Sequence, residues 1–127
     1  MTPSKTQIDG ILRRHLPRGW KLRVEPMPDR GIAEFKTRTL WLKYATDVFA
    51  FLHEVGHVRC AHWGDAKVPR HVQEYEAERY AIHVMRAEGL RVPHREIRDA
   101  KDNVRDRVRE DEYRQIKIDP KIRRWCK

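Results

Sequence analysis

Residues 53–57, with the sequence HEVGH, constrain this chain more than any other segment. Histidines at positions i and i+4 project from one face of an α-helix, so His53 and His57 can reach one Zn²⁺ ion only if this segment is helical. On such a helix Glu54 is rotated by about 100° from His53. We expect Glu54 to hold the water at the metal and to accept its proton, and not to be a ligand. The motif therefore predicts a helix here and a third ligand from another element.

The third ligand is predicted in a second helical segment, which contains the sequence EYEAERYA at residues 74–81. One face of that helix is formed by Glu74, Ala77, Glu78, Ala81 and Met85. Two carboxylates on a face of small and apolar residues are costly to bury unless they meet a metal or a hydrogen-bond donor. We assign Glu74 as the third zinc ligand, and Glu78 as the acceptor of a hydrogen bond from the outer N–H group of a ligand histidine. Glu76 points about 160° away from Glu74 and is expected to face solvent.

Two residues that follow His57 are rival ligands. Some zinc sites of this kind take a third histidine shortly after the first two, but their chains turn at a glycine first, and here no glycine lies between His57 and Gly64. On a continuous helix His62 would point about 140° away from His57, so we do not expect it to bind the ion. Cys60 lies nearly on the face of His57, and we expect a buried thiol of the core rather than a spare ligand.

The sequence does not distinguish a hydrogen-bond donor for a developing oxyanion. The candidates are His71, His83, His94, Tyr44, Tyr80 and Tyr113. For each of them, a role in packing or at the surface is the better explanation.

Hydrophobic periodicity predicts an α+β chain in which one helix precedes a small sheet and further helices follow it. The first helix is expected over residues 4–16, where Ser4 and Gln7 have the spacing of a capping box and Pro17 follows the end. Strands are expected over residues 20–24, 32–36 and 39–44, with a loop over 26–31. The last two strands are expected to form a hairpin that turns at residues 37–38.

Three more helices are expected after the sheet, over residues 47–61, 72–88 and 93–115, with a loop over 64–69. Thr46 or Asp47 can cap the first of them, and Gly89 ends the second. The third has a narrow apolar stripe, so it lies at the edge of the core or meets a partner; the stripe consists of Ile97, Ala100, Val104 and Val108. The tail carries Ile116, Ile118, Ile122 and Trp125 and is expected to pack back onto the domain.

The length of 127 residues predicts a single domain, with a core over about residues 20–90 and a C-terminal helix and tail over 91–127. No apolar run approaches the ~20 residues that a membrane-spanning helix needs, and the first ten residues do not resemble a signal peptide. Cys60 and Cys126 make neither a disulfide framework nor a Cys-x-x-Cys site. We therefore expect a cytoplasmic protein with reduced thiols and no membrane partner.

The net charge of +9 is concentrated in the two flanks of the sequence. Residues 1–43 and 91–127 are strongly basic, whereas residues 44–90 carry a small excess of acidic groups. A basic surface can attract nucleic acid without sequence preference. The same composition also serves to keep a small protein soluble.

The two motifs together resemble the ImmA/IrrE family of zinc metallopeptidases, which occurs in bacteria, phages and mobile elements. Residues 52–57 look like the active-site helix of that family, and residues 74–81 are similar to its second motif, a Glu followed by Ala-Asn and an aromatic-Ala pair. The resemblance covers roughly residues 32–85. It implies His53, His57 and Glu74 as zinc ligands and Glu54 as the general base. Glu78 departs from the family pattern, which usually has Asn or Asp at that position.

The resemblance also implies a fold and a substrate. The fold would be a minimal, gluzincin-like zincin, in which a small mixed sheet packs on the HExxH helix. Residues 39–44 would then be the edge strand along which an extended substrate peptide pairs. Members of the family commonly cut a repressor or another regulator, so the implied substrate is a regulatory protein.

Three functions are consistent with these features. The first is a zinc-dependent metalloendopeptidase that hydrolyses a peptide bond in a protein or peptide substrate. The second is a nucleic-acid-associated protein with a zincin-like site, whose contacts would come from Arg105, Arg107, Arg109, Arg123 and Arg124. The third is a catalytically idle zincin scaffold that binds a protein partner through the helix over residues 93–115. The sequence has no recognised nucleic-acid reader motif, and a purely structural metal site needs no general base such as Glu54, so we expect the endopeptidase.

Overall fold

The computed structural model describes residues 2–63 and 67–127, and it confirms the α+β class. In chain order the elements are α1 (Lys5–His15), β1 (Lys21–Val24), β2 (Gly31–Glu34), β3 (Thr39–Leu42), α2 (Val48–Arg59), α3 (Arg70–Ala87), α4 (His94–Tyr113) and α5 (Pro120–Trp125). Part of the loop predicted over residues 64–69 lies outside the described residues. In the described part of the chain, no helix is both long and apolar enough to cross a membrane.

The small sheet has the strand order β1-β3-β2. Strands β2 and β3 are antiparallel, with Ile32 opposite Trp41, and the turn between them contains Arg38 at a φ of 52°. The predicted hairpin is therefore confirmed. Strand β1 pairs with the other side of β3 in parallel, with Leu22 opposite Leu40.

The expectation that residues 39–44 form an edge strand is wrong, because β3 is the central strand. Its inward side chains, Leu40 and Leu42, are fully buried. The error has a topological cause: β1 precedes the hairpin in sequence but returns to its far side, and local periodicity does not report such pairings. The free edge beside α2 belongs to β2.

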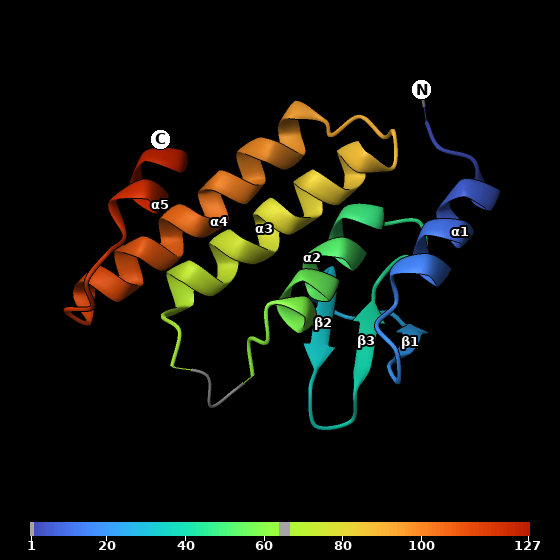
Figure 1. The fold of residues 1–127 in the computed structure, drawn as a ribbon, viewed down its shortest axis with the longest axis horizontal. Helices are drawn as coiled ribbons and strands as arrows, with labels where there is room; N and C mark the ends of the chain where they lie inside the picture. Colours follow the sequence, from blue (N-terminus) through green and yellow to red (C-terminus); the bar gives the residue numbers. More distant parts are fainter. Residues whose placement is uncertain (1, 64–66) are drawn as a thin grey trace.

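Helix α2 lies between the sheet and α3 and is buried on most of its surface (Figure 1). Of the two predicted caps, Asp47 is the one used, since its Oδ1 accepts a hydrogen bond from the Ala50 N–H at 3.1 Å. Gly56 permits a close approach of α3, because a Cβ atom there would lie 3.0 Å from the Cα atom of Ala77. The two helices that carry the predicted ligands are thus in direct contact.

Helices α3 and α4 run antiparallel, side by side (Figure 1). Helix α3 begins at Arg70, two residues earlier than predicted, because the carbonyl of Pro69 already accepts the Val72 N–H at 3.0 Å. Its predicted end is confirmed: Gly89 has a φ of 78°, and the next N–H, of Leu90, donates to the Met85 carbonyl at 2.9 Å.

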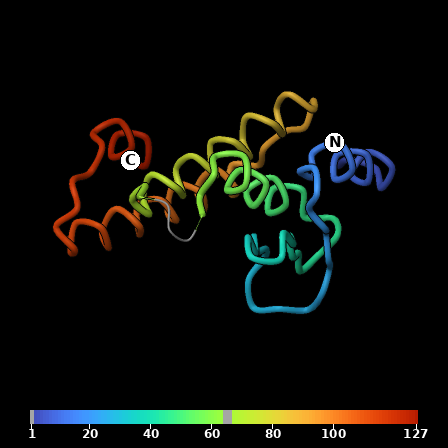
Figure 2. The backbone as a smooth tube through the Cα atoms, turned by 60° about the horizontal axis from the view of Figure 1, so that its bottom comes forward, coloured from blue at the N-terminus to red at the C-terminus, as the bar shows by residue number. Residues whose placement is uncertain are grey.

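The apolar core consists of two clusters along the long axis of the molecule. The larger cluster joins α1, the sheet, α2 and part of α3. The smaller one joins α3, α4 and α5 through Tyr75, Val104, Val108, Ile118, Ile122 and Cys126. The predicted packing of the tail is therefore confirmed, and Figure 2 shows α5 and α1 at opposite ends of the molecule.

Candidate functional site

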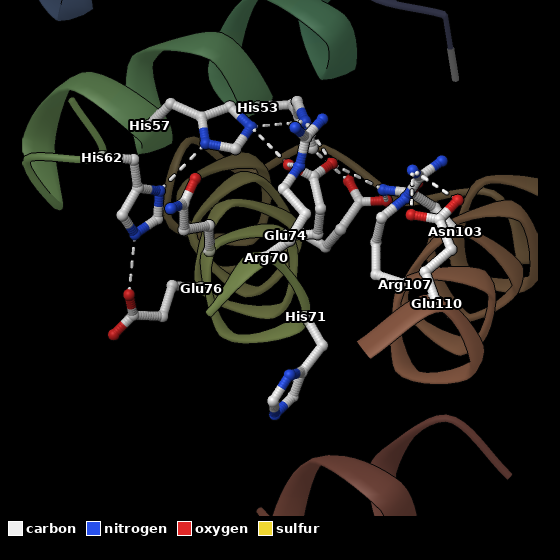
Figure 3. A network of polar contacts seen from close by, with 12 residues as sticks. His53, His57, His62, Arg70, His71, Glu74, Glu76, Asn103, Arg107 and Glu110 are labelled. Carbon is white, nitrogen blue, oxygen red and sulfur yellow. Dashed lines mark hydrogen bonds and ion pairs between the residues drawn. The ribbon is translucent and has the colours of Figure 1, made fainter. Parts of the chain in front are cut away.

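Helices α2 and α3 bring together a group that could hold a metal ion, consisting of His53, His57 and Glu74. The Nε2 atoms of the two histidines lie 3.1 Å apart. The carboxylate of Glu74 lies between them, with one oxygen 3.0 Å from His57 Nε2 and the other 3.5 Å from His53 Nε2 (Figure 3). Three ligand atoms therefore converge on one point from the helix faces that the spacing predicted.

The ring of His53 is held from its other side by Glu78. Its Nδ1 atom lies 2.6 Å from Oε1 of Glu78, which is itself buried. With the proton on Nδ1 donated to Glu78, the lone pair of Nε2 is free to face the group. Glu78 thus occupies the place expected for it, and the longer Glu side chain reaches the histidine.

The side-chain amide of Asn103 connects the group to α4. It donates a hydrogen bond to Oε1 of Glu74 at 2.9 Å, and it lies 3.4 Å from Oε2 of Glu78. Sequence reasoning missed this residue. The only signal was its three-residue spacing from Ala100, which places Asn103 beside the apolar stripe of that helix.

His62 is not directed away from His57, as a continuous helix would require. Helix α2 ends at Arg59, and Ala61 has a φ of 57°, so the chain turns back and the His62 N–H donates to the His57 carbonyl at 2.9 Å. The Nδ1 atoms of the two rings lie 2.9 Å apart, and His62 Nε2 lies 2.7 Å from Oε1 of Glu76. His62 therefore contacts the outer nitrogen of His57, on the side opposite the converging ligand atoms.

Glu54 borders the metal-ligand group without joining it. Its nearest carboxylate oxygen lies 3.9 Å from His53 Nε2. Its Cγ atom packs against β2, where a Cβ atom on Gly31 would lie only 3.0 Å away. Burial raises the pKa of Glu54, although nearby positive charge on His53 and His57 opposes that rise. A carboxylate with a raised pKa beside a cluster of imidazoles suits proton transfer.

The electrostatics of the group favour a cation at its centre. Burial alone would lower the pKa of His53, but hydrogen bonds to Glu74 and Glu78 raise it well above its usual range. Burial would likewise raise the pKa of Glu74, but hydrogen bonds from His53 and His57 hold it far below its usual range. A proton on His53 thus balances the carboxylates, and a metal ion bound by these ligands would take its place.

A cleft of about 720 Å³ opens onto the group. One wall is formed by β2 and Phe35, and the opposite wall by α3 and α4, with Arg70, Gln73, Asp99 and Asn103. The Lys43 N–H donates to the Arg30 carbonyl at 3.0 Å. This hydrogen bond determines which alternate residues of β2 direct their backbone groups toward β3. The backbone N–H and C=O groups of Gly31 and Ala33 therefore point away from β3, toward the free edge.

None of the six proposed oxyanion donors lines this cleft. His71 is buried against Asp111 and points away from the group (Figure 3). Tyr80 is half-buried, and the other four are exposed on the surface; they are Tyr44, His83, His94 and Tyr113. Beyond the histidines and Glu54, the polar side chains that line the cleft come from the segment just before β2, with Asp29 and Arg30, and from α3 and α4.

Cys60 is half-exposed at the end of α2, so the expectation of a buried core thiol is wrong. Cys60 caps the C-terminal end of α2, and its thiol lies beside His62 and Glu76, with which it forms a second group of potential metal ligands. Partial burial and the negative charge of Glu76 raise the pKa of this thiol. Glu76 is 43% exposed, so it faces solvent in part, as predicted, while it also contacts His62.

Comparison of the chain with protein-family models, with curated proteins and with solved structures found no match.

Proposed function

We propose that this protein is a zinc-dependent metalloendopeptidase of the ImmA/IrrE type. The observation that carries the proposal is the convergence of His53, His57 and Glu74 on one point of a cleft, with Glu54 beside them. The motif resemblance and the packing of a small mixed sheet on the HExxH helix support the same family.

The donor set supports zinc as the metal. Two imidazoles and one carboxylate form the ligand set of many catalytic zinc sites, in which a fourth position stays open. Bonds of 2.0–2.1 Å in tetrahedral geometry separate ligand atoms by about 3.3 Å. The two Nε2 atoms are 3.1 Å apart, and they lie 3.0 and 3.5 Å from the two different oxygens of Glu74, distances close to that value. A zinc ion bound here supplies Lewis acidity, which polarises a carbonyl oxygen and lowers the pKa of water.

Within this proposal Glu54 moves the proton. Its carboxylate accepts a proton from the attacking water and delivers it to the leaving amine. The contact with Gly31 fixes the position of the Glu54 side chain, and burial with a raised pKa favours both proton transfers. Glu78 and His62 hold the two histidine rings from outside, and Asn103 holds Glu74.

The free edge of β2 supports an extended peptide as the substrate. The outward N–H and C=O groups of Gly31 and Ala33 can pair with a peptide backbone that lies in the cleft. This edge replaces β3, to which the resemblance had assigned that role. The regulatory protein as substrate follows from the resemblance alone.

The basic flanks give the nucleic-acid hypothesis no added support. Four of its five arginines form ion pairs with acidic side chains, namely Arg105, Arg107, Arg109 and Arg123. The idle scaffold is disfavoured because Glu54 is buried beside the ligands at the cleft, where a purely structural site has no use for it.

The test combines metal analysis with the substitution Glu54→Gln. We expect one zinc ion per chain in the wild type and in the variant, and a fall in peptide cleavage of at least about 10²–10⁴-fold in the variant, because Gln cannot accept the proton. Cleavage of a peptide library is followed by mass spectrometry.

Asp99→Asn is the matched control, because Asp99 lines the same cleft but is exposed. It should cleave at the wild-type rate. Wild-type cleavage by Glu54→Gln would refute the proposal, and so would iron in place of zinc, since two histidines and one carboxylate also form the site of iron oxygenases.

A further inference from the structure

A second group of metal-ligating side chains lies on the outer side of His57. It consists of Cys60, which caps the C-terminal end of α2, His62 in the following turn, and Glu76 on α3. One ligand atom from each of these residues lies within 4.8 Å of the other two. In the described part of the chain, only this group and the group of His53, His57 and Glu74 have three ligand atoms gathered in this way.

The chemistry of this outer group suits a thiophilic divalent ion. A thiolate, an imidazole and a carboxylate are all zinc ligands, and the sulfur adds affinity for soft metals. The His62 side chain is 1% exposed and therefore fixed, whereas Glu76 is 43% exposed and Cys60 is half-exposed. The group thus has one rigid ligand and two that solvent reaches, which gives an ion an entry path.

One hydrogen bond couples the outer group to the inner one. The Nδ1 atoms of His57 and His62 are 2.9 Å apart, so a single proton lies between them. When His57 Nε2 binds a metal, its Nδ1 carries that proton and His62 Nδ1 accepts it. His62 Nε2 then carries the second proton and donates to Glu76, from which it lies 2.7 Å away.

Metal binding at the outer group requires the opposite arrangement. His62 Nε2 must then be unprotonated, so its proton sits on Nδ1 and is donated to His57 Nδ1. His57 Nε2 carries the other proton and cannot bind a metal. Each arrangement places two protons on the two rings, but on different nitrogen atoms.

We propose that Cys60, His62 and Glu76 form a second metal site whose occupation weakens metal binding by His53, His57 and Glu74. The existence of this outer site is independent of the proposed function. Its regulatory effect rests on the proposed function, because it acts on the proposed catalytic zinc: surplus zinc fills the outer site and inhibits the enzyme. Loss of a partner that orients a ligand histidine lowers metal affinity by about 10–100-fold, and the effect is reciprocal between the two sites.

Cobalt(II) titration of the metal-free protein with reduced thiols tests the outer site. The first equivalent should give visible absorption without a thiolate-to-cobalt charge-transfer band, because the inner ligands are nitrogen and oxygen. Surplus Co²⁺ should then produce that band in the near ultraviolet. Cys60→Ser should abolish the band, and Glu76→Gln should move it to higher Co²⁺ concentration. Cys126→Ser is the matched control and should retain it, since Cys126 is buried in the smaller apolar cluster.

Glu74→Ala tests the coupling, because it weakens the inner site alone. In this variant the thiolate band should appear at about 10–100-fold lower Co²⁺ concentration than in the wild type. An unchanged midpoint refutes the coupling. The absence of the band in the wild type, or its survival in Cys60→Ser, refutes the outer site. A protein that shows the band but cleaves no peptide refutes the proposed function and leaves the outer site standing.

Discussion

Helix α3 carries two buried networks of histidine and carboxylate, and they differ in how their polar atoms are matched. At its N-terminal end the His71 ring donates from Nδ1 to Asp111 at 2.7 Å, and the backbone N–H of the same residue donates to the same oxygen at 2.9 Å. His71 Nε2 lies 3.4 Å from the Asp119 N–H. Both side chains are almost completely buried. Every nitrogen of this ring therefore has its own partner.

The network around Glu74 is matched differently. The Nε2 atoms of His53 and His57 face each other at 3.1 Å, and both face one carboxylate. The Nδ1 atoms of both rings already have hydrogen-bond partners. The two Nε2 atoms therefore converge on the same carboxylate, and neither has a partner of its own. Burial beside a carboxylate therefore does not by itself indicate a metal site. The candidate site differs in that two ring nitrogens converge at a cleft without separate partners.

The largest effect that separates the two networks is expected in metal affinity. Loss of an orienting partner lowers metal affinity by about 10–100-fold. Glu74→Ala should reduce zinc affinity by more than this, because it removes a proposed ligand. Glu76→Ala, two residues away, should lose far less, and His71→Ala should retain the metal. Competition with a chelator measures all three. If Glu76→Ala strips the metal and Glu74→Ala keeps it, the ligand assignment is wrong.

The next largest effect is expected in stability, at the other network. Asp111→Ala leaves the backbone N–H and the ring N–H of His71 buried without an acceptor, at about 1–3 kcal/mol each. We therefore expect a loss of about 2–6 kcal/mol in the free energy of unfolding, with one zinc per chain unchanged. Denaturant titration and metal analysis of the same sample check this. Loss of zinc from a folded Asp111→Ala variant would contradict the expectation that the His71 network affects stability and not metal binding.

A smaller change in stability is expected where α2 and α3 pack together beneath the Glu74 network. Gly56→Ala would place a Cβ atom 3.0 Å from the Ala77 Cα atom and so push α2 and α3 apart, at about 1–3 kcal/mol of stability. Gly10→Ala in α1 is the matched control, because its new methyl group meets only the flexible end of Arg14, at 3.0 Å. That change should stabilise the protein by about 0.5–1 kcal/mol. Equal effects in thermal melts would contradict the packing argument.

The smallest effect concerns another histidine–carboxylate pair, which lies near the surface. Glu88 contacts His15 at 2.7 Å and also pairs with Arg14, and these hydrogen bonds lower the pKa of Glu88. A lowered folded-state pKa stabilises the protein above the unfolded-state value of about 4.3. That stability is lost as the pH falls through the folded-state pKa.

Glu88→Gln should therefore cost at most about 1 kcal/mol at pH 7. Its unfolding curve should converge with that of the wild type when the pH is well below 4. A difference that persists at low pH would show that packing, and not charge, accounts for the effect.

Helical phase was sufficient to predict which residues share a face. The spacing of His53 and His57, and of Glu74 and Glu78, placed each pair correctly on its helix, and the capping box of α1 followed from Ser4 and Gln7. These are local properties of the chain. The roles of the four site residues in metal binding and catalysis stay predictions.

The pairing of distant segments and one reversal of the backbone could not be predicted from the sequence. The position of β1 beside β3 depends on contacts between residues 18 apart, and Asn103 reaches Glu74 only because α4 packs on α3. The chain brings His62 back to His57 through a left-handed conformation at Ala61. Alanine rarely adopts this conformation, so the residue type at this position does not predict the turn.

The free edge of β2 has a consequence for self-association. An unpaired strand edge that can accept a peptide can equally accept the same strand of a second molecule. This edge is only four residues long, and charged residues, Arg30 and Glu34, stand just before it and at its end. Two copies that paired antiparallel through β2 would gain few backbone hydrogen bonds, because within the strand only Gly31 and Ala33 direct their N–H and C=O groups outward. The shortness of the strand therefore protects the molecule against edge-to-edge aggregation.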